Sequence, residues 1–140
     1  MYAALEAANP SSLQTSLGGG SAYNAIHALA QMHLDLRLGY VGVAGRVPGP
    51  GMSAVQQFET LGVDHSFVFR DNDHLCGVCF GFTENGERTL LTHAGANAAM
   101  ADHIDSAFDE LVAYLATARV IHVTSFLDDS TPSRLLRAVP

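Results

Sequence analysis

The chain has 140 residues, of which 48% are hydrophobic and 15% are charged, and its formal net charge is -7. This length and composition predict one modest globular domain and argue against a disordered tail. The acidic excess argues against nucleic acid and anionic membranes as partners, since both attract clustered basic side chains. No apolar run approaches the length of a membrane span, and residues 1–10 lack the basic residues of a secretory signal. We therefore expect a cytoplasmic protein.

Three glycines, at residues 18–20, lead directly into a pattern with helical spacing over residues 22–32. Glycines allow unusual backbone conformations and let a ligand come close to the main chain. The start of a helix adds unpaired N–H groups and the positive end of the helix dipole. Asn24 adds an amide that both donates and accepts hydrogen bonds. Together these features predict a site for a hydroxyl-rich small molecule or an anion.

A purely structural interpretation of the same stretch is also open. The glycines would then only turn the chain, with Ser21 as the N-cap of the helix. Asn24 would tie down the loop by bonding a backbone group. A third interpretation, a phosphate-binding loop of an unrelated nucleotide-binding domain, is weakest. The glycines match neither G-x-G-x-x-G nor G-x-x-x-x-G-K-[ST], and no lysine follows them.

The next elements alternate between strand and helix. Residues 36–44 are apolar on both faces, which is typical of a parallel strand covered on both sides. Apolar residues at helical spacing predict a helix over residues 52–61, which Gly62 would end as the C′ residue. Residues 66–70 predict a short strand.

The middle of the chain predicts an antiparallel hairpin. Residues 77–83 and 87–93 resemble strands, and the Asn85-Gly86 pair between them is a strong turn signal. Cys76 and Cys79 have the C-x-x-C spacing, but no second ligand pair for zinc accompanies them. We expect reduced, partly buried thiols. The histidines are scattered singly, so we expect no metal site.

The last third predicts a helix over residues 102–117, a second buried strand over residues 119–125, and a helix that Ser130 caps, with Pro132 near its start. Alternating strands and helices predict an α/β fold with a parallel sheet flanked by helices. We expect residues 36–44 and 119–125 to form that sheet and the hairpin to project from it. The strands are few for so many helices, so we expect an incomplete domain.

Three local patterns resemble, in their order and spacing, the ribokinase-like carbohydrate kinases of the PfkB family. Residues 19–25 are similar to the signature G-G-x-x-x-N-x-A. Residues 42–64 look like the next strand and helix of that family, with its Gly-Val-Asp ending, and residues 85–97 look like its lid hairpin and the following loop. The resemblance implies that residues 1–140 are the N-terminal part of one ribokinase-like domain, with a lid hairpin at about 76–93.

The resemblance implies an ATP-dependent sugar or nucleoside kinase, which transfers a phosphoryl group to a hydroxyl of its substrate. It implies that the substrate is bound by Gly19, Gly20, Ser21 and Asn24. The hairpin would be part of a lid that closes over the sugar and pairs two copies as a homodimer. The implied cofactors are ATP, Mg2+ and a monovalent cation, whose sites we do not expect in this chain.

The departures from the family pattern matter as much as the match. Residues 1–17 do not supply the family's first strand with its substrate-binding aspartate, and Arg46 stands where an aspartate is usual. No Gly-Ala-Gly-Asp signature occurs, so we expect the anion hole, the catalytic base and the ATP site beyond residue 140. The chain therefore resembles the N-terminal half of a kinase, whether as a truncated product, a gene fragment or one product of a split gene. We expect it to be inactive alone.

A second function therefore stays open beside the kinase. The chain is then a non-catalytic α/β module that binds a small polyol, a nucleoside or a partner chain without turnover. A Gly-Ala-Gly-Asp signature downstream of Pro140 would favour the kinase. Which sugar or nucleoside binds depends on residues that complete the pocket from outside this chain.

Overall fold

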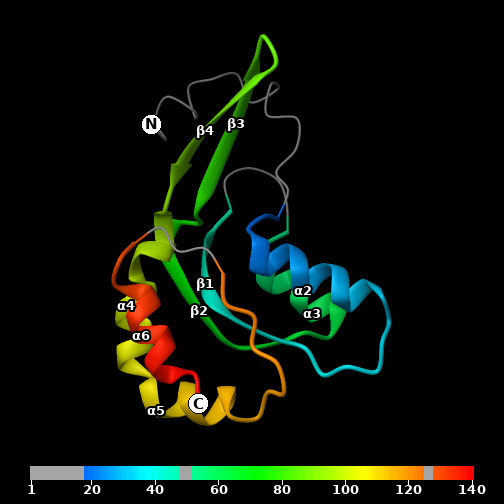
Figure 1. Cartoon of the computed structure of the whole chain (residues 1–140), viewed down its shortest axis with the longest axis vertical. Helices are drawn as coiled ribbons and strands as arrows, with labels where there is room; N and C mark the ends of the chain where they lie inside the picture. Colours follow the sequence, from blue (N-terminus) through cyan, green and yellow to red (C-terminus); the bar gives the residue numbers. More distant parts are fainter. Residues whose placement is uncertain (1–17, 48–51, 125–127) are drawn as a thin grey trace.

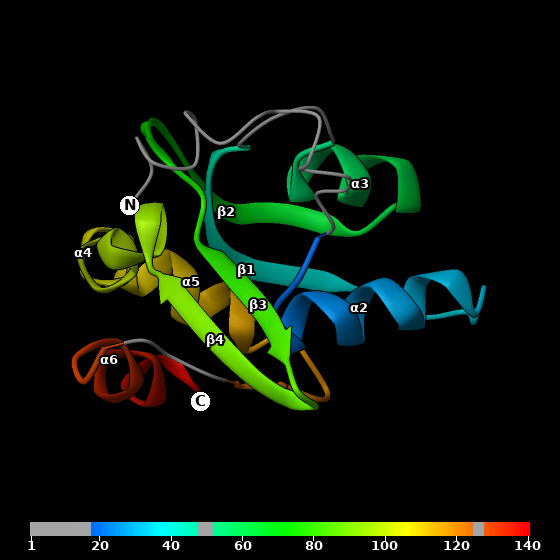
Figure 2. The ribbon, with the colours of Figure 1, turned by 90° about the horizontal axis from the view of Figure 1, so that it is seen from above.

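The computed structural model describes residues 18–47, 52–124 and 128–140. Two parallel strands run through the centre of the body, and an antiparallel hairpin projects from one end of it (Figure 1). Helices α2 (Ser21–Gln31) and α3 (Ala54–Leu61) lie on one side of these strands. On the other side lie α4 (Met100–Ser106), α5 (Phe108–Leu115) and α6 (Thr131–Ala138), as Figure 2 shows. This arrangement confirms the expected α/β fold class.

Some expectations fall outside the described residues. They include the absence of a strand from residues 1–17 and the end of a predicted strand at residue 125.

Strand β1 (Gly39–Arg46) is the centre of the body and pairs in parallel with β2 (Asp64–Leu75). Its side chains alternate between the two faces, as they must in an extended strand. Tyr40 packs with the α2–α3 layer, whereas Val41 and Val43 pack with the α4–α5–α6 layer. The prediction that this strand packs on both faces is confirmed, but its residues are only partly buried. The predicted start at residue 36 is wrong, because Leu36 lies before the strand and is 53% exposed.

The expected partner of β1 is wrong. Residues 119–124 form no strand, and β2, where we expected only residues 66–70, is the neighbour of β1 instead. Within residues 119–124, Ile121 packs against the core, but Val120 is 85% exposed. An apolar run becomes a strand only where a neighbouring strand receives its backbone hydrogen bonds, and periodicity does not report that neighbour.

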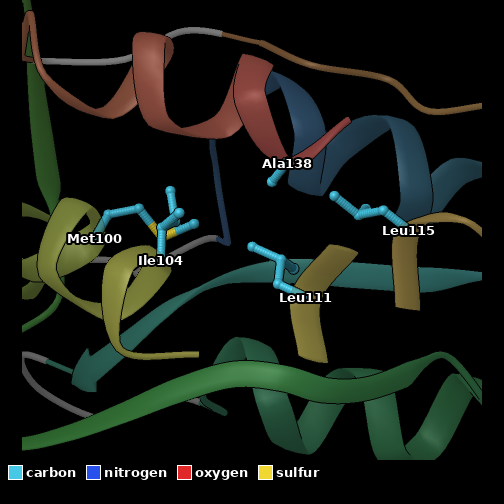
Figure 3. Close-up of a cluster of buried hydrophobic side chains, with 5 residues drawn as sticks. All are labelled: Met100, Ile104, Leu111, Leu115 and Ala138. Atoms are coloured by element: carbon cyan, nitrogen blue, oxygen red, sulfur yellow. The ribbon is translucent and has the colours of Figure 1, made fainter. Parts of the chain in front are cut away.

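The helix expected over residues 102–117 is also wrong in its extent, because it is two helices. A 3-10 turn, η2 (Gly95–Ala99), leads into α4, and Ala107 separates α4 from α5 with φ -127° and ψ 33°. Alanine has the highest helix propensity, so no local signal marks this break. Figure 3 shows Ile104 of α4 and Leu111 of α5 directed into one cluster. Tertiary packing therefore overrides the local preference here.

Two hydrophobic clusters hold the layers to the strands. The larger contains Met100, Ile104, Leu111, Leu115 and Ala138 (Figure 3). The smaller joins α2 and α3 through Tyr23, Phe58 and Val63. Each cluster also contacts side chains of β1. Burial of these apolar groups supplies the main favourable free energy of folding.

At the helix ends, some of the capping interactions predicted from sequence are present and one is not. Gly62 ends α3 with a left-handed φ of 69°, as expected. Ser53 and Gln56 form a capping box at the start of that helix, which was not predicted and which places the start at Ala54 rather than at residue 52. Ser130 occupies the N-cap position of α6, but its side chain does not cap the helix. The Asp128 carboxylate instead accepts hydrogen bonds from the backbone N–H groups of Ser130 and Thr131. With the Ser130 hydroxyl, these donors hold the pKa of Asp128 well below its usual range.

The hairpin is confirmed. Strands β3 (Val78–Glu84) and β4 (Glu87–His93) pair antiparallel, and Asn85 and Gly86 both have positive φ at the turn. Both cysteines are free. Cys76 is partly buried, but the expectation is wrong for Cys79, which is exposed because the hairpin stands away from the body.

We expect Leu111→Ala to lower the free energy of unfolding by about 2 to 5 kcal/mol, because it leaves a cavity in the larger cluster. Leu136→Ala on α6 is the matched control, since Leu136 is 67% exposed. Its effect should stay within about 0.5 kcal/mol. Urea unfolding followed by circular dichroism measures both values. Equal losses in the two variants would contradict the assignment of this core.

Candidate functional site

The predicted site lies where several chain segments meet at one end of the body. The start of α2, the carboxyl end of β1 and the base of the hairpin all lie at that end (Figure 1). In open α/β sheets, ligands bind outside the carboxyl ends of the parallel strands. The fold therefore places the glycine stretch at the usual location of a ligand site.

The glycine backbone is accessible. A Cβ atom added to Gly19 or to Gly20 would meet no atom of the described residues within 4 Å. Gly20 is the N-cap of α2 and has φ 95° and ψ 141°, a conformation that residues with side chains rarely adopt. No side chain caps α2, and its first turn contains no acidic residue. Among the described residues, no side-chain cap therefore competes with a ligand at this positive end of the helix dipole.

Tyr23 fixes this helix start to the body. Its ring is buried and packs against Phe58, and its hydroxyl donates a hydrogen bond to Oε1 of Gln57 in α3. Burial raises the pKa of Tyr23. Gly18 lies against the same ring, since an added Cβ would come within 2.6 Å of it. The sequence pattern alone assigns no role to Tyr23. Its role as an anchor of α2 follows from the residues that surround it in the structure.

Asn24 lies one turn into α2 with an exposed side chain. Its backbone N–H donates to the carbonyl oxygen of Gly20 at 2.9 Å. The side-chain amide makes no hydrogen bond to any described residue. In the described part of the chain, the amide therefore does not tie down the loop.

Ser21 is the first residue of α2, and the alternative that it caps the helix is wrong because Gly20 takes that position. The Ser21 hydroxyl instead lies 2.5 Å from the hydroxyl of Thr124. Thr124 was not among the predicted site residues. One available signal was its place near the carboxyl end of a predicted strand, where ligands bind in α/β folds.

The glycine stretch itself has no charged side chain. Residues 18–24 contain no acidic or basic side chain, and Arg46 is exposed at the end of β1. Within the described ranges, no group of His, Cys, Asp or Glu is arranged to hold a metal ion. The site can thus form hydrogen bonds through main-chain N–H groups, hydroxyls and one amide. These are groups that recognise hydroxyl-bearing ligands.

We expect Gly20→Ala to destabilise the chain by about 1 to 3 kcal/mol, because alanine is strained at the positive φ of this position. Gly19→Ala is the matched control, since the space around Gly19 is open. Its stability should change by less than about 0.5 kcal/mol. Thermal melts monitored by circular dichroism separate the two. A Gly20 variant as stable as the wild type would contradict the described start of α2.

The described residues contain no helix long and apolar enough to cross a membrane.

No curated protein sequence matches the chain. Among solved structures, the crystal structure of fructokinase from Xylella fastidiosa has a similar fold, with a TM-score of 0.52 and 15% sequence identity. The likeness covers 89% of this chain and 50% of that chain, so this chain spans half the length of that fructokinase. The sequence model of the pfkB family of carbohydrate kinases matches residues 6–139. Because that match extends over nearly the whole chain, the protein belongs to the pfkB family of carbohydrate kinases.

Proposed function

We propose that this chain is the substrate-binding and lid half of an ATP-dependent sugar or nucleoside kinase. Residues 1–140 would form the N-terminal part of one ribokinase-like domain, with residues 76–93 as its lid hairpin. The observation that carries the proposal is the open glycine backbone beside exposed Asn24, at the uncapped start of α2. In a chain of this family, such a site fits a polyol. We place the kinase in the cytoplasm, where ATP is made and used.

The described residues would act by binding and orienting the substrate. Main-chain N–H groups at Gly19, Gly20 and Ser21 would donate to substrate hydroxyl oxygens, and Asn24 would donate to one hydroxyl and accept from another. Holding a hydroxyl in a fixed position lowers the entropic part of the barrier to its reaction. Neutral donors suit hydroxyls, which carry no charge to neutralise.

The cofactors would be ATP and Mg2+, with a monovalent cation. Bound ATP supplies the phosphoryl group, and Mg2+ neutralises the charge that develops on it. The described residues do not fit such a site, because they include no metal-binding cluster and residues 18–24 have no charged group. We therefore derive no step of phosphoryl transfer from these residues and assign them to the substrate alone.

We expect Asn24→Ala to weaken sugar binding by about 1 to 3 kcal/mol, because it leaves polar groups of a bound substrate unpaired. The melting temperature should stay unchanged, since the amide makes no hydrogen bond within the described structure. Calorimetric titration with a panel of sugars and nucleosides, together with thermal melts, measures both. If this chain binds none of them, the same substitution is tested in a kinase that contains this half.

Gln31→Ala is the control for that substitution, because Gln31 is an exposed amide at the other end of the same helix. It should leave affinity unaltered. Unchanged affinity in Asn24→Ala with a lower melting temperature would assign Asn24 a structural role.

We expect the purified chain to phosphorylate no sugar or nucleoside, because residues 1–140 contain no G-x-G-D sequence to supply an anion hole and base. The alternative, a module that binds a polyol without turnover, shares this outcome, so a Gly-Ala-Gly-Asp signature downstream of Pro140 is what would separate the two. A coupled assay for ADP release over the same panel measures it. Turnover that persists after repurification, and that Asn24→Ala reduces, would overturn the assignment of catalysis to other residues.

We also propose that the hairpin pairs two copies of the chain. Leu90 and Leu91 are neighbours on β4, so they lie on opposite faces of the hairpin, and both are exposed. An isolated two-stranded hairpin has marginal stability unless another surface covers it. A second hairpin of the same composition would bury the leucine on the face that it covers.

We expect sedimentation equilibrium to show a dimer, and the double variant Leu90→Thr/Leu91→Thr to be a monomer. Threonine keeps the β propensity of the strand while removing apolar area. Leu136→Thr, which also removes an exposed leucine but lies on α6, should remain a dimer. A monomeric wild type at high protein concentration would contradict the proposal.

A further inference from the structure

The hairpin is connected to the body by two very short links. Strand β2 passes into β3 through Cys76 and Gly77, and β4 passes into η2 through Ala94. We call Cys76, Gly77, Ala94 and Gly95 the hairpin joint. Figure 1 shows the hairpin extending from this joint, away from the helical layers. The direction of the hairpin therefore depends on the geometry of these few residues.

Close backbone approaches hold one side of the joint to the body. The carbonyl oxygen of Arg46, at the end of β1, accepts a hydrogen bond of 2.8 Å from the N–H of Cys76. A Cβ atom on Gly45 would lie 2.6 Å from that same nitrogen. A Cβ atom on Gly95, which has φ 54°, would lie 2.6 Å from the carbonyl oxygen of Cys76. There is no room for a side chain at Gly45 or at Gly95. The backbones of β1, the β2–β3 link and η2 are therefore in direct contact.

A side chain completes the other side of the joint. The amide of Asn97 lies against the bare backbone of Gly77, because a Cβ atom on Gly77 would overlap Nδ2 of Asn97 and lie 3.4 Å from its Cγ. Asn97 belongs to η2, and its neighbour Ala96 is buried in the body. The backbone N–H of Asn97 also donates to the carbonyl oxygen of Ala94 at 3.1 Å. Asn97 thus joins a fixed part of the body to the residue where the hairpin begins.

We propose that Asn97 is a positioning residue, which sets the angle of the hairpin by packing its amide on Gly77. Gly45 and Gly95 would hold the joint in place, and the Asn97–Gly77 contact would fix the remaining rotation between the β2–β3 link and η2. The contact lies within this chain and requires no ligand. If the hairpin is a lid, as in the proposed function, this contact determines how the lid stands over the start of α2.

The test uses residual dipolar couplings of backbone N–H groups in the full chain, which report how the hairpin is oriented relative to the body. In the wild type, couplings of β3–β4 and of the body should fit one alignment tensor. Asn97→Ala removes the contact, so the hairpin couplings should no longer fit the tensor of the body. Gly77→Ala adds a methyl group that would overlap Asn97 and lie 3.0 Å from the carbonyl oxygen of Ala94, so it disturbs the joint and should also cause a loss of fit.

Two matched controls and one conservative variant accompany these changes. Asn72→Ala removes an exposed amide from β2, and Gly81→Ala adds a methyl group where only ordinary contacts of 3.5 Å and beyond occur. Both should keep the common tensor. In Asn97→Asp, the new side chain has nearly the shape of asparagine, so the hairpin should keep the wild-type orientation.

Hydrogen exchange separates positioning from simple unfolding of the hairpin. If Asn97 acts on the joint alone, amides inside the β3–β4 ladder should exchange in Asn97→Ala as slowly as in the wild type. The proposal is overturned if Asn97→Ala keeps the common tensor, if the wild-type hairpin already fails to fit it, or if ladder exchange rises together with the loss of fit. If Asn97→Ala does not fold, Asn97→Ser, which also removes the amide from Gly77, is compared with Asn72→Ala in its place. These measurements do not depend on whether the chain binds sugar, so a failure of the proposed function would not change their outcome.

Discussion

Strand β1 must be apolar on two faces at once, and the arrangement of the helices follows from that requirement. Tyr40 is part of the contacts of one helical layer, and Val41 and Val43 are part of the other. A strand whose successive side chains enter opposite cores cannot shift its register by one residue without exchanging the two sets. The same strand ends beside the start of α2 and the hairpin joint. The position of the candidate site is therefore a consequence of packing in the body.

The chemistry of the candidate site comes mainly from what its residues lack. Gly19 and Gly20 have no side chains, so the main chain is open to a ligand, and α2 has no capping side chain to compete for its N–H groups. Tyr23 compensates by anchoring the helix through the core of α2 and α3. The site is thus open at its surface and firmly held from below. Such a combination of rigid support and exposed main chain suits recognition of a small polar molecule.

The local parts of this fold could be predicted from sequence, because they depend on interactions within a few residues. The capping box of Ser53 and Gln56 and the left-handed Gly62 define α3 almost completely. The positive φ values of the Asn85-Gly86 turn follow from the residue types alone, and so does the hairpin around it. The glycine stretch before α2 was also correctly placed at a helix start. Steric rules and short-range hydrogen bonds decide each of these features.

Only the tertiary structure decided which segments meet. Residues 119–124 have the apolar pattern of a strand, but among the described residues they have no neighbouring strand to pair with. The break at Ala107 opposes local propensity and arises because α4 and α5 pack into one cluster. The contacts of Ser21 with Thr124, and of Asn97 with Gly77, join residues that no short-range pattern relates. Strand pairing and helix packing bring together segments that are far apart in the chain. A local residue pattern describes only one of the two segments that meet.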